Sequence, residues 1–487
     1  MPLPPRASVL SWRVAVLWVA LLASPIWAAG PAPARSGRPP NIVVIIADDL
    51  GYGDLGVYGH PTMRTPRLDR MAAEGIRFTQ FYAAASVCTP SRAALLTGRL
   101  PIRSGMSSDR RRVLFPDSGG GLPASEITLA RALETKSYAT AAIGKWHLGH
   151  LERFLPTSHG FDSYYGIPYS NDMDRVDDAQ VPKGRAAFWR PKVDYWNVPL
   201  MRDNTIIERP ADQTTITRRY TDEAIRFIER HRDQPFFLYL AHTMPHVPLF
   251  RSSDFEGVSA RGLYGDVVEE IDSSTGRILD TLDRLGLDEE TIVWFTSDNG
   301  PWLTFDEQGG SAGLLREGKG STWEGGMRVP GIARWPGHIR AGTVSLDVAS
   351  AMDIFTTSLT LAGVALPDDR IVDGVDLSAV LSGTGKSPRE TMFFYRGTRL
   401  MAVRHGPWKA HFITQASYGD KSPEKHDPPL LFHLQQDPSE QYDRSKDHPE
   451  VVAQIKQLVG RHGADLEAPP SQLEIPLPIE TRHGARR

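Results

Sequence analysis

The sequence predicts an α/β fold with a mainly parallel sheet flanked by helices, followed by a smaller C-terminal α+β domain with an antiparallel sheet. Apolar runs without a polar face recur along the chain, as expected of central strands that are buried on both sides. Amphipathic stretches such as residues 215–231 and 266–285 lie between these runs and predict helices. From about residue 390, short alternating segments replace this pattern, which is typical of antiparallel strands.

Four apolar runs are predicted to be the central strands. They are Ile42–Ala47, Tyr138–Ile143, Phe236–Leu240 and Thr291–Thr296. After the first strand, Thr65 is predicted to cap a helix that stops at Gly75. We therefore expect a main domain over residues 41–365.

The C-terminal domain is expected over residues 366–487. Its predicted strands cover residues 391–396, the hairpin 399–413 with a Gly406-Pro407 turn, and residues 430–435. A turn at 437–443 and one helix near residues 450–463 complete this domain, whose sheet is expected to pack on the large one.

The N-terminus has the order of a secretory signal peptide. Arg6 and Arg13 precede the apolar run Val14–Ala23, and small residues at 28–30 follow it. We expect a signal peptide over residues 1–28 and a flexible spacer over 29–40. The run is short for a membrane span, so no stable membrane insertion is expected, with an uncleaved anchor as the alternative.

Charge and cysteine content narrow the class of protein and its compartment. The 487 residues carry a net charge of -3, which gives no reason to expect nucleic acid as a partner. One cysteine allows no internal disulfide, and the sequence has no Asn-x-Ser/Thr acceptor for glycosylation. These features favour an exported protein of the bacterial periplasm, with secretion as the alternative.

Polar residues follow each of the four predicted strands. In parallel sheets the carboxyl ends of the strands share one edge, where ligands bind. Asp48, Asp49, Asp298 and Asn299 together offer three carboxylates and an amide oxygen, which suit Ca²⁺ or Mg²⁺ better than Zn²⁺. The alternative is that Asp49 or Asn299 only caps a loop.

Cationic residues lie beside these motifs. Arg92, Lys145 and Lys319 next to a bound divalent ion would favour an anionic substrate, such as a sulfate or phosphate ester. Each of these side chains taken alone is more often a surface charge.

Histidines at the same edge are candidates for proton transfer near neutral pH. His147 follows the second predicted strand, and His246 lies in a proline-containing loop after the third. His242 competes with His246 for contact with the leaving group, and each histidine has a structural hydrogen-bonding role as its alternative.

The single cysteine, Cys88, is predicted to lie at the start of a helix. Thr89 is a plausible N-cap, Pro90 suits the first helical position, and Gly98 ends the helix. The positive end of the helix dipole would favour a thiolate there, and Arg92 can reach back towards it. However, a thiolate attacking a sulfate ester would give a sulfur–sulfur product with no easy exit. A buried, inert cysteine is the alternative.

The segment C-T-P-S-R followed by L-T-G-R resembles the signature of the type I sulfatases. NIVVIIADDLGYGDLGVYGHP, AAIGKWHLG, GIPYSND, FTSDNGP, GLLREGKGSTWEGG and PPLLFHL extend the resemblance over nearly the whole chain and look closest to the arylsulfatase A branch. The resemblance implies an alkaline phosphatase-like fold and a sulfuric ester hydrolase of the arylsulfatase type. Residues 41–365 would be its catalytic domain.

The same resemblance implies a modified cysteine and a metal ion. A maturation enzyme would oxidise Cys88 to Cα-formylglycine (3-oxoalanine), and the modified residue would face a Ca²⁺ ion. One hydroxyl of the hydrated aldehyde would attack sulfur to give a sulfated enzyme, and the other would expel sulfate. The implied calcium ligands are Asp48, Asp49, Asp298 and Asn299, together with residue 88.

Roles for the remaining site residues also follow from the resemblance. Arg92 would stabilise the diol and His147 would hydrogen-bond it. Lys145 and Lys319 would hold sulfate oxygens. Ser170 would contact the sulfate region, and His246 would protonate the leaving alcohol or phenol.

The sequence departs from the arylsulfatase A type, which is rich in cysteine and glycosylated. Residues 172–210 contain none of the motifs and are expected near the substrate entrance, so an aryl, lipid or carbohydrate sulfate ester is possible.

One alternative is a phosphatase or phosphodiesterase of the same superfamily. The two-zinc members often place histidine after aspartate, whereas Asn299 follows Asp298 here. The other alternative is an inactive calcium-binding protein.

Overall fold

The fold is built around the β1 strand, whose side chains alternate between two hydrophobic cores. Val43 and Ile45 pack into one core, and Val44 and Ile46 pack into the other. The structure is a computed structural model that describes residues 1–2, 37–418 and 422–477. Because β1 is buried on both faces, it lies at the centre of a large sheet.

This large sheet has the strand order β10-β2-β9-β8-β1-β7-β3-β4-β5-β6 in the described part of the chain. β1 pairs in parallel with β7 and β8, β3 pairs in parallel with β7 and β4, and β10 pairs in parallel with β2. The pairs that involve β9, and the β4–β5 and β5–β6 pairs, are antiparallel. The strands are β1 (Asn41–Ala47), β2 (Ile76–Tyr82), β3 (Ala139–Gly144), β4 (Ser163–Gly166), β5 (Leu200–Arg202), β6 (Thr205–Glu208), β7 (Phe236–Ala241), β8 (Thr291–Ser297), β9 (Arg328–Arg334) and β10 (Thr343–Ser350).

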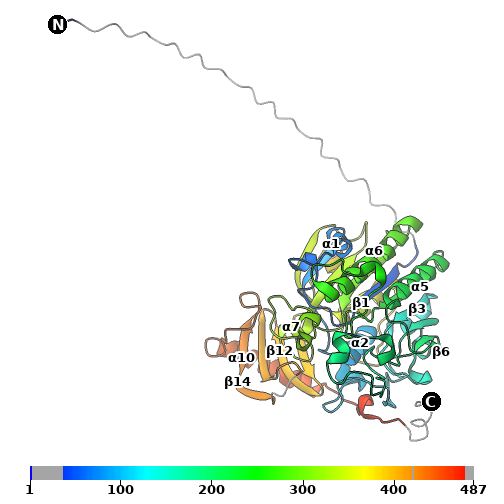
Figure 1. The fold of residues 1–487 in the computed structure, drawn as a ribbon. Helices are drawn as coiled ribbons and strands as arrows, with labels where there is room; N and C mark the ends of the chain where they lie inside the picture. The colour runs from blue at the N-terminus through cyan, green and yellow to red at the C-terminus, as the bar shows by residue number, and fades with distance from the viewer. Residues whose placement is uncertain (3–36, 419–421, 478–487) are drawn as a thin grey trace. The chain divides into compact units, whose positions relative to one another are not determined.

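Helices cover both faces of this sheet. α1, α5 and α6 contribute to one core, and α2, α3, α8 and α9 contribute to the other. Figure 1 shows α1, α5 and α6 on one side of β1, with α2 on the opposite side. The α-helices are α1 (Pro66–Ala73), α2 (Cys88–Thr97), α3 (Leu129–Leu133), α4 (Ala186–Trp189), α5 (Ile216–Arg230), α6 (Gly262–Leu285), α7 (Glu324–Met327), α8 (Ala351–Ala362), α9 (Ser378–Leu381) and α10 (Pro449–Ala464).

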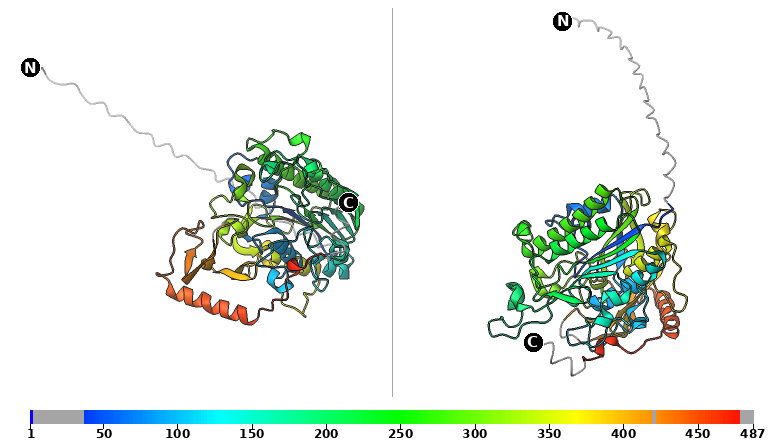
Figure 2. Two further views of the ribbon diagram at one scale, coloured as in Figure 1. Left: turned by 60° about the horizontal axis from the view of Figure 1, so that its bottom comes forward. Right: turned by 90° about the vertical axis from the view of Figure 1, so that its right-hand side faces the viewer.

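A second sheet forms the C-terminal part of the chain. It is antiparallel, with the order β11-β12-β13-β14, and α10 packs beside it, as the left-hand view of Figure 2 shows. Tyr82 of β2 and Met327 of α7 share a hydrophobic cluster with Phe394 of β11, so the small sheet packs on the large one. Its strands are β11 (Thr391–Arg396), β12 (Arg399–His405), β13 (Trp408–Thr414) and β14 (Glu424–His433).

The structure confirms the predicted fold class, and the four predicted central strands lie within a residue of β1, β3, β7 and β8. Two local predictions hold only in part. Thr65 is the N-cap residue of α1, as predicted, but its hydroxyl accepts a hydrogen bond from the Gly56 amide and donates one to Asp69, so its side chain makes no capping hydrogen bond. The strand predicted over residues 430–435 begins earlier in the structure and ends two residues sooner, since β14 spans Glu424–His433.

The described residues from 37 to 477 belong to one compact unit, and the boundary between residues 365 and 366 stays a prediction. The predicted signal peptide lies almost wholly outside the described residues, as does most of the predicted spacer. Among the helices that the structure describes, none is long and apolar enough to cross a membrane.

Strand register brings the polar residues together at one edge. Ala47 pairs with Ser297, and Gly144 pairs with Ala241, at the last positions of four neighbouring parallel strands. Each chain segment leaves its strand there, so the residues that follow converge at the carboxyl edge of the sheet.

Candidate active site

The acidic part of the site is formed by the loops after β1 and β8. The backbone amide of Asp49 donates to Oδ1 of Asp298 over 3.1 Å, and Nδ2 of Asn299 donates to Oδ1 of Asp49 over 2.7 Å. Asp49 has a φ of 65°, which turns the chain sharply after Asp48. The two loops therefore hold Asp48, Asp49, Asp298 and Asn299 in one buried cluster.

This cluster fits a hard divalent cation. Burial raises the pKa of Asp49 to about 7 against the attraction of Lys319, with repulsion from Asp48 adding to the effect. Burial and Asp48 also raise the pKa of Asp298. Among the described residues, Oδ1 of Asn299 is buried and has no hydrogen-bond partner. Three carboxylates and a spare amide oxygen are the donor set that Ca²⁺ or Mg²⁺ prefers.

Three buried cationic side chains face these carboxylates. Nζ of Lys145 donates to Asp48 and, over 3.0 Å, to Ser170 Oγ; Nζ of Lys319 donates to Asp49 over 2.7 Å. Arg92, from α2, donates through Nε to Asp298 over 2.9 Å and through Nη1 to the Lys145 carbonyl over 2.7 Å.

Cys88 is the first residue of α2, and its surroundings bear on two predictions. Val87 precedes the helix, while the Thr89 hydroxyl donates to the His147 carbonyl over 2.9 Å, so Thr89 is not the N-cap. Burial raises the pKa of the Cys88 thiol well above 9, against the attraction of Lys145 and Lys319, so burial opposes the thiolate that the helix dipole would favour. The thiol instead donates to Asp48 over 3.5 Å. Gly98 ends the helix with a φ of 68°, as predicted.

His147 is fixed by one ring nitrogen and leaves the other unpaired. Its Nε2 lies 2.9 Å from the Leu114 carbonyl, which places the proton on Nε2. Among the described residues, the buried Nδ1 atom has no hydrogen-bond partner. Burial and the neighbouring Lys145 lower the pKa of His147 well below 6.5, so Nδ1 is a free acceptor at neutral pH.

The structure shows that His246 and His242, the two candidates for contact with the leaving group, have different surroundings. Nε2 of His246 lies 3.5 Å from Ser170 Oγ and 3.6 Å from Oδ2 of Asp49, whereas Nε2 of His242 faces Ser274 of α6 at 3.3 Å. Nδ1 of His246 points at the Val247 carbonyl at 2.5 Å and carries the ring proton. Burial and Lys319 lower the pKa of His246 well below 6.5, which favours the neutral ring. A second proton on Nε2 would have the Asp49 carboxylate as its partner.

Ligand atoms of Asp48, Asp49, Cys88 and His246 all lie within 4.8 Å of one another. His246 was expected to contact the leaving group, so its place among the possible ligands was not anticipated.

Sequence reasoning missed an aromatic group beside Lys319. The Trp302 ring lies 4.4 Å from Lys319 Nζ and 5.2 Å from the His246 ring. The ring of Tyr418, from the C-terminal sheet region, is tilted against that of Trp302 with its centre 5.2 Å away, and it lies under Arg112 at 4.5 Å. The FTSDNGPW segment shows Trp302 next to the Asp298 motif, but no sequence pattern links Tyr418 to the site.

A buried ionic cluster joins the Lys319 loop to the C-terminal sheet. Nζ of Lys409 lies 2.8 Å from Glu324 and 3.1 Å from Glu440, and all three side chains are buried. The Glu324 amide also donates to Glu440 over 2.7 Å, and His411 Nε2 lies 2.6 Å from the same carboxylate. Against the effect of burial, Lys409 lowers the pKa of Glu324 to about 2. The C-terminal sheet thus fixes the end of the segment that carries Lys319.

We expect the substitution Lys409→Met to destabilise the protein by about 3–5 kcal/mol, because it removes the buried ammonium group that two buried carboxylates share. The free energy of unfolding from urea titration measures this. Lys456→Met is the matched control, because Lys456 pairs with an exposed Asp427 and its loss should change stability by about 0–1 kcal/mol. Equal stability of the two variants would contradict the structural role of the cluster.

Comparisons with known proteins agree with this geometry. A sulfatase family model matches residues 40–364, and a model of the C-terminal region of aryl-sulfatase matches residues 387–480. Arylsulfatase A of Bos taurus is 45% identical over 91% of this chain and 90% of its own length. N-acetylgalactosamine-6-sulfatase of Canis lupus familiaris is 40% identical over 97% and 93%. The crystal structure of the PsFucS1 sulfatase from Pseudoalteromonas sp. superposes with a TM-score of 0.79 at 32% identity, covering 89% of this chain and 92% of that one.

The fold and these relatives define an enzyme of the sulfuric ester hydrolase class. The chain belongs to the sulfatase family, and its resemblance to the arylsulfatase A branch is confirmed.

Proposed function

We propose that this enzyme is an exported arylsulfatase-type hydrolase that uses a formylglycine made from Cys88 and a bound calcium ion. The observation that carries the proposal is the convergence of Asp48, Asp49, Cys88 and His246 at the carboxyl edge of the sheet. The neutral, buried thiol of Cys88 is a poor nucleophile, so a modified side chain accounts better for a position among these charged groups.

Calcium would be held by Asp48, Asp49, Asp298, Asn299 and the modified residue 88, with Mg²⁺ as the alternative. When present, the ion supplies positive charge to the sulfate group, and the hydrated aldehyde supplies an oxygen nucleophile. Within the proposed site, the buried side chains of three carboxylates (Asp48, Asp49 and Asp298) and three cations (Arg92, Lys145 and Lys319) have formal charges that cancel. A divalent ion would therefore leave the site positive, as an anionic ester requires.

The side chains of the chain itself then bind and orient the substrate. Lys145 and Lys319 are the groups proposed to hold sulfate oxygens, and Ser170 would orient the same group through its contact with Lys145. The free Nδ1 of His147 would accept a hydrogen bond from a hydroxyl at position 88, which is consistent with its lack of another partner among the described residues. Arg92 would stabilise the diol, and its hydrogen bonds to Asp298 and to the Lys145 carbonyl hold α2 against the loops after β8 and β3.

His246 is the residue proposed to face the leaving group. Its Nε2 is directed at Ser170 and Asp49 rather than at the Val247 carbonyl, so this nitrogen is the one that can exchange a proton with an alcohol or phenol oxygen. Residues 172–210 stay our candidate for the substrate entrance.

The natural substrate is proposed to be a small-molecule, glycan or lipid sulfate ester. The relatives are named for aryl, N-acetylgalactosamine and steryl sulfates, so the family permits all three kinds of leaving group. A maturation enzyme that oxidises Cys88 is the implied partner. Residues 1–28 are proposed to direct export, to the bacterial periplasm or outside the cell, and residues 41–365 and 366–487 to form the two domains.

A peptide mass spectrum that covers residue 88 tests this function directly. The protein should come from its native source or from a host that contains the maturation enzyme. We expect an aldehyde or its hydrate at position 88. An unmodified thiol in native protein would contradict the mechanism and favour an inactive binding protein.

A further inference from the structure

A basic pocket lies between the catalytic loops and the C-terminal sheet. It has a volume of about 310 Å³ and is lined by Arg112, Arg396 and Arg399, with Asp109 as its one acidic lining residue in the described chain. This volume is at the lower end of the range for small-molecule sites. Its lining therefore carries three guanidinium groups and one carboxylate.

Of the three arginines that line the pocket, only Arg399 forms an ion pair with Asp109. Asp109 accepts hydrogen bonds from the amide and hydroxyl of Thr398 and lies 3.3 Å from Nε of Arg399. Arg396 donates to the Ala416 carbonyl over 2.7 Å, which is an uncharged partner. Among the described residues, the buried Nη1 of Arg112 has no hydrogen-bond partner.

Arg112 differs from the two arginines that precede it. Arg110 pairs with Glu474, and Arg111 pairs with Asp117. Two guanidinium groups of the pocket, those of Arg112 and Arg396, thus lack a carboxylate partner among the described residues. A charged group that faces a cavity without a partner is a binding element for a ligand of opposite charge.

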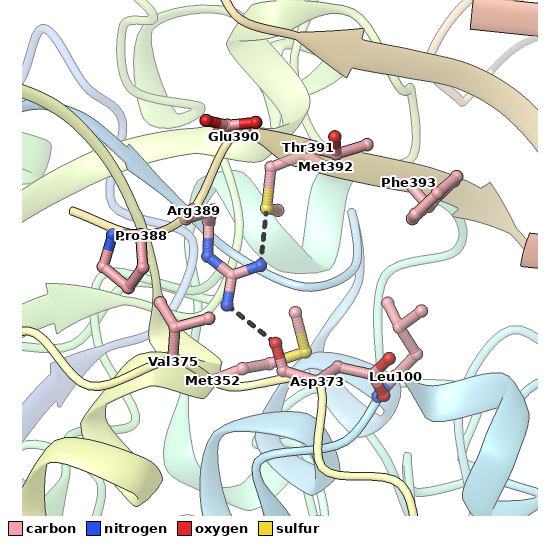
Figure 3. A pocket seen from close by; sticks show the side chains of 10 residues that line it. All are labelled: Leu100, Met352, Asp373, Val375, Pro388, Arg389, Glu390, Thr391, Met392 and Phe393. Atoms are coloured by element: carbon pink, nitrogen blue, oxygen red, sulfur yellow. Dashed lines mark hydrogen bonds between the residues drawn. The ribbon is translucent and has the colours of Figure 1, made fainter. Parts of the chain in front are cut away.

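Two other pockets in the described part of the chain do not share this property. In the pocket of Figure 3, Arg389 donates to Asp353 and to the Asp373 carbonyl, so its charge serves the packing of the chain. In a further pocket, Arg99 pairs with Glu126 and Arg370 pairs with Asp369.

The basic pocket adjoins the candidate active site. Arg112 lies over the Tyr418 ring, and a Cβ on Gly320, next to Lys319, would be only 2.6 Å from Nη1 of Arg112. A smaller cavity of about 30 Å³ is also lined by Arg112 and Arg396 and reaches Val87 and Pro90, on either side of the Cys88-Thr89 pair.

We propose that this pocket binds a second anionic group, a carboxylate or a sulfate, of the substrate whose sulfate ester is hydrolysed at residue 88. The inference rests on the proposed function and narrows its substrate class. The enzyme acts on sulfate esters that carry at least two negative charges, as an acidic sulfated saccharide does, in preference to neutral steroid or simple aryl esters. Arg112 and Arg396 are the specificity-determining residues.

The test compares a sulfated disaccharide that contains a uronic acid with its carboxyl methyl ester and with a disulfated disaccharide that lacks the carboxylate. We expect kcat/KM to be about tenfold higher for the two dianionic substrates than for the methyl ester, the effect of one charged hydrogen bond. Arg396→Gln should bring this ratio close to one. Arg370→Gln, which removes an arginine that is already paired, should leave the ratio unchanged.

Binding gives a second readout that needs no turnover. Calorimetry with the Cys88→Ala protein should show the same preference for the acidic disaccharide over its methyl ester, and Arg396→Gln in that background should remove it. Equal affinities for the two ligands would overturn the pocket assignment. If wild-type enzyme hydrolyses none of these esters but the binding preference persists, the proposed function fails while the anion site stands.

Discussion

Replacing Cys88 with alanine should lower the hydrolysis of sulfate esters by at least about a thousandfold, because the side chain that becomes the nucleophile is lost. The cationic side chains and the acidic loops would remain, so substrate binding should persist. The measurement is kcat/KM with 4-nitrophenyl sulfate on enzyme from a host that contains the maturation enzyme.

The control for this variant must show that the fold survives. Cys88 is almost fully buried, and removal of one sulfur atom should change the free energy of unfolding by only about 1 kcal/mol. Ser358→Ala is a matched truncation, since Ser358 is buried in α8 and, within the described chain, its hydroxyl has no hydrogen-bond partner. That variant should retain full activity. Ester hydrolysis at the wild-type rate by Cys88→Ala would refute the nucleophile assignment.

Asp298→Asn should weaken calcium binding and lower activity by at least about a hundredfold. The substitution keeps the shape of the side chain but removes a charge from the proposed metal site. It also leaves Arg92 without the carboxylate that lies 2.9 Å from its Nε. Calcium affinity from isothermal titration calorimetry, together with kcat/KM, measures both effects.

Asp254→Asn is the matched control, because Asp254 is an exposed aspartate in the short turn Ser253–Phe255 and is not one of the proposed metal ligands. Wild-type enzyme that has been treated with a chelator should regain activity with Ca²⁺, since the donors are oxygen atoms. Unchanged calcium affinity in Asp298→Asn would exclude Asp298 as a ligand, and recovery with Zn²⁺ alone would contradict the oxygen-ligand site.

The local sequence was sufficient for the central strands and for the residues at their ends. A run such as Ile42–Ala47 has no polar face, so it can only be a strand covered on both sides, and β1 is one. Parallel pairing then forces Asp48, Lys145, His246 and Asp298 to the same edge, whatever the side chains between them. The family motif around Cys88 added the class of reaction.

The sequence did not reveal how the charges at this edge are partnered. Thr89 has the properties of an N-cap, but its hydroxyl bonds to His147, because the loop after β3 offers a carbonyl at the right distance. From the sequence alone, two features favoured the charged thiolate of Cys88: the positive end of the helix dipole and the nearby cationic side chains. Burial beside Asp48 outweighs both, because desolvation penalises the charged form.

By itself, the sequence determined the fold class, the family and the residues that converge on the site, since these depend on local patterns and on the fixed geometry of parallel sheets. Only the tertiary structure decided that Lys409 anchors the Lys319 loop and that Arg112 and Arg396 share a pocket. These facts depend on contacts between segments far apart in the chain, and no local pattern encodes which distant charges will become neighbours.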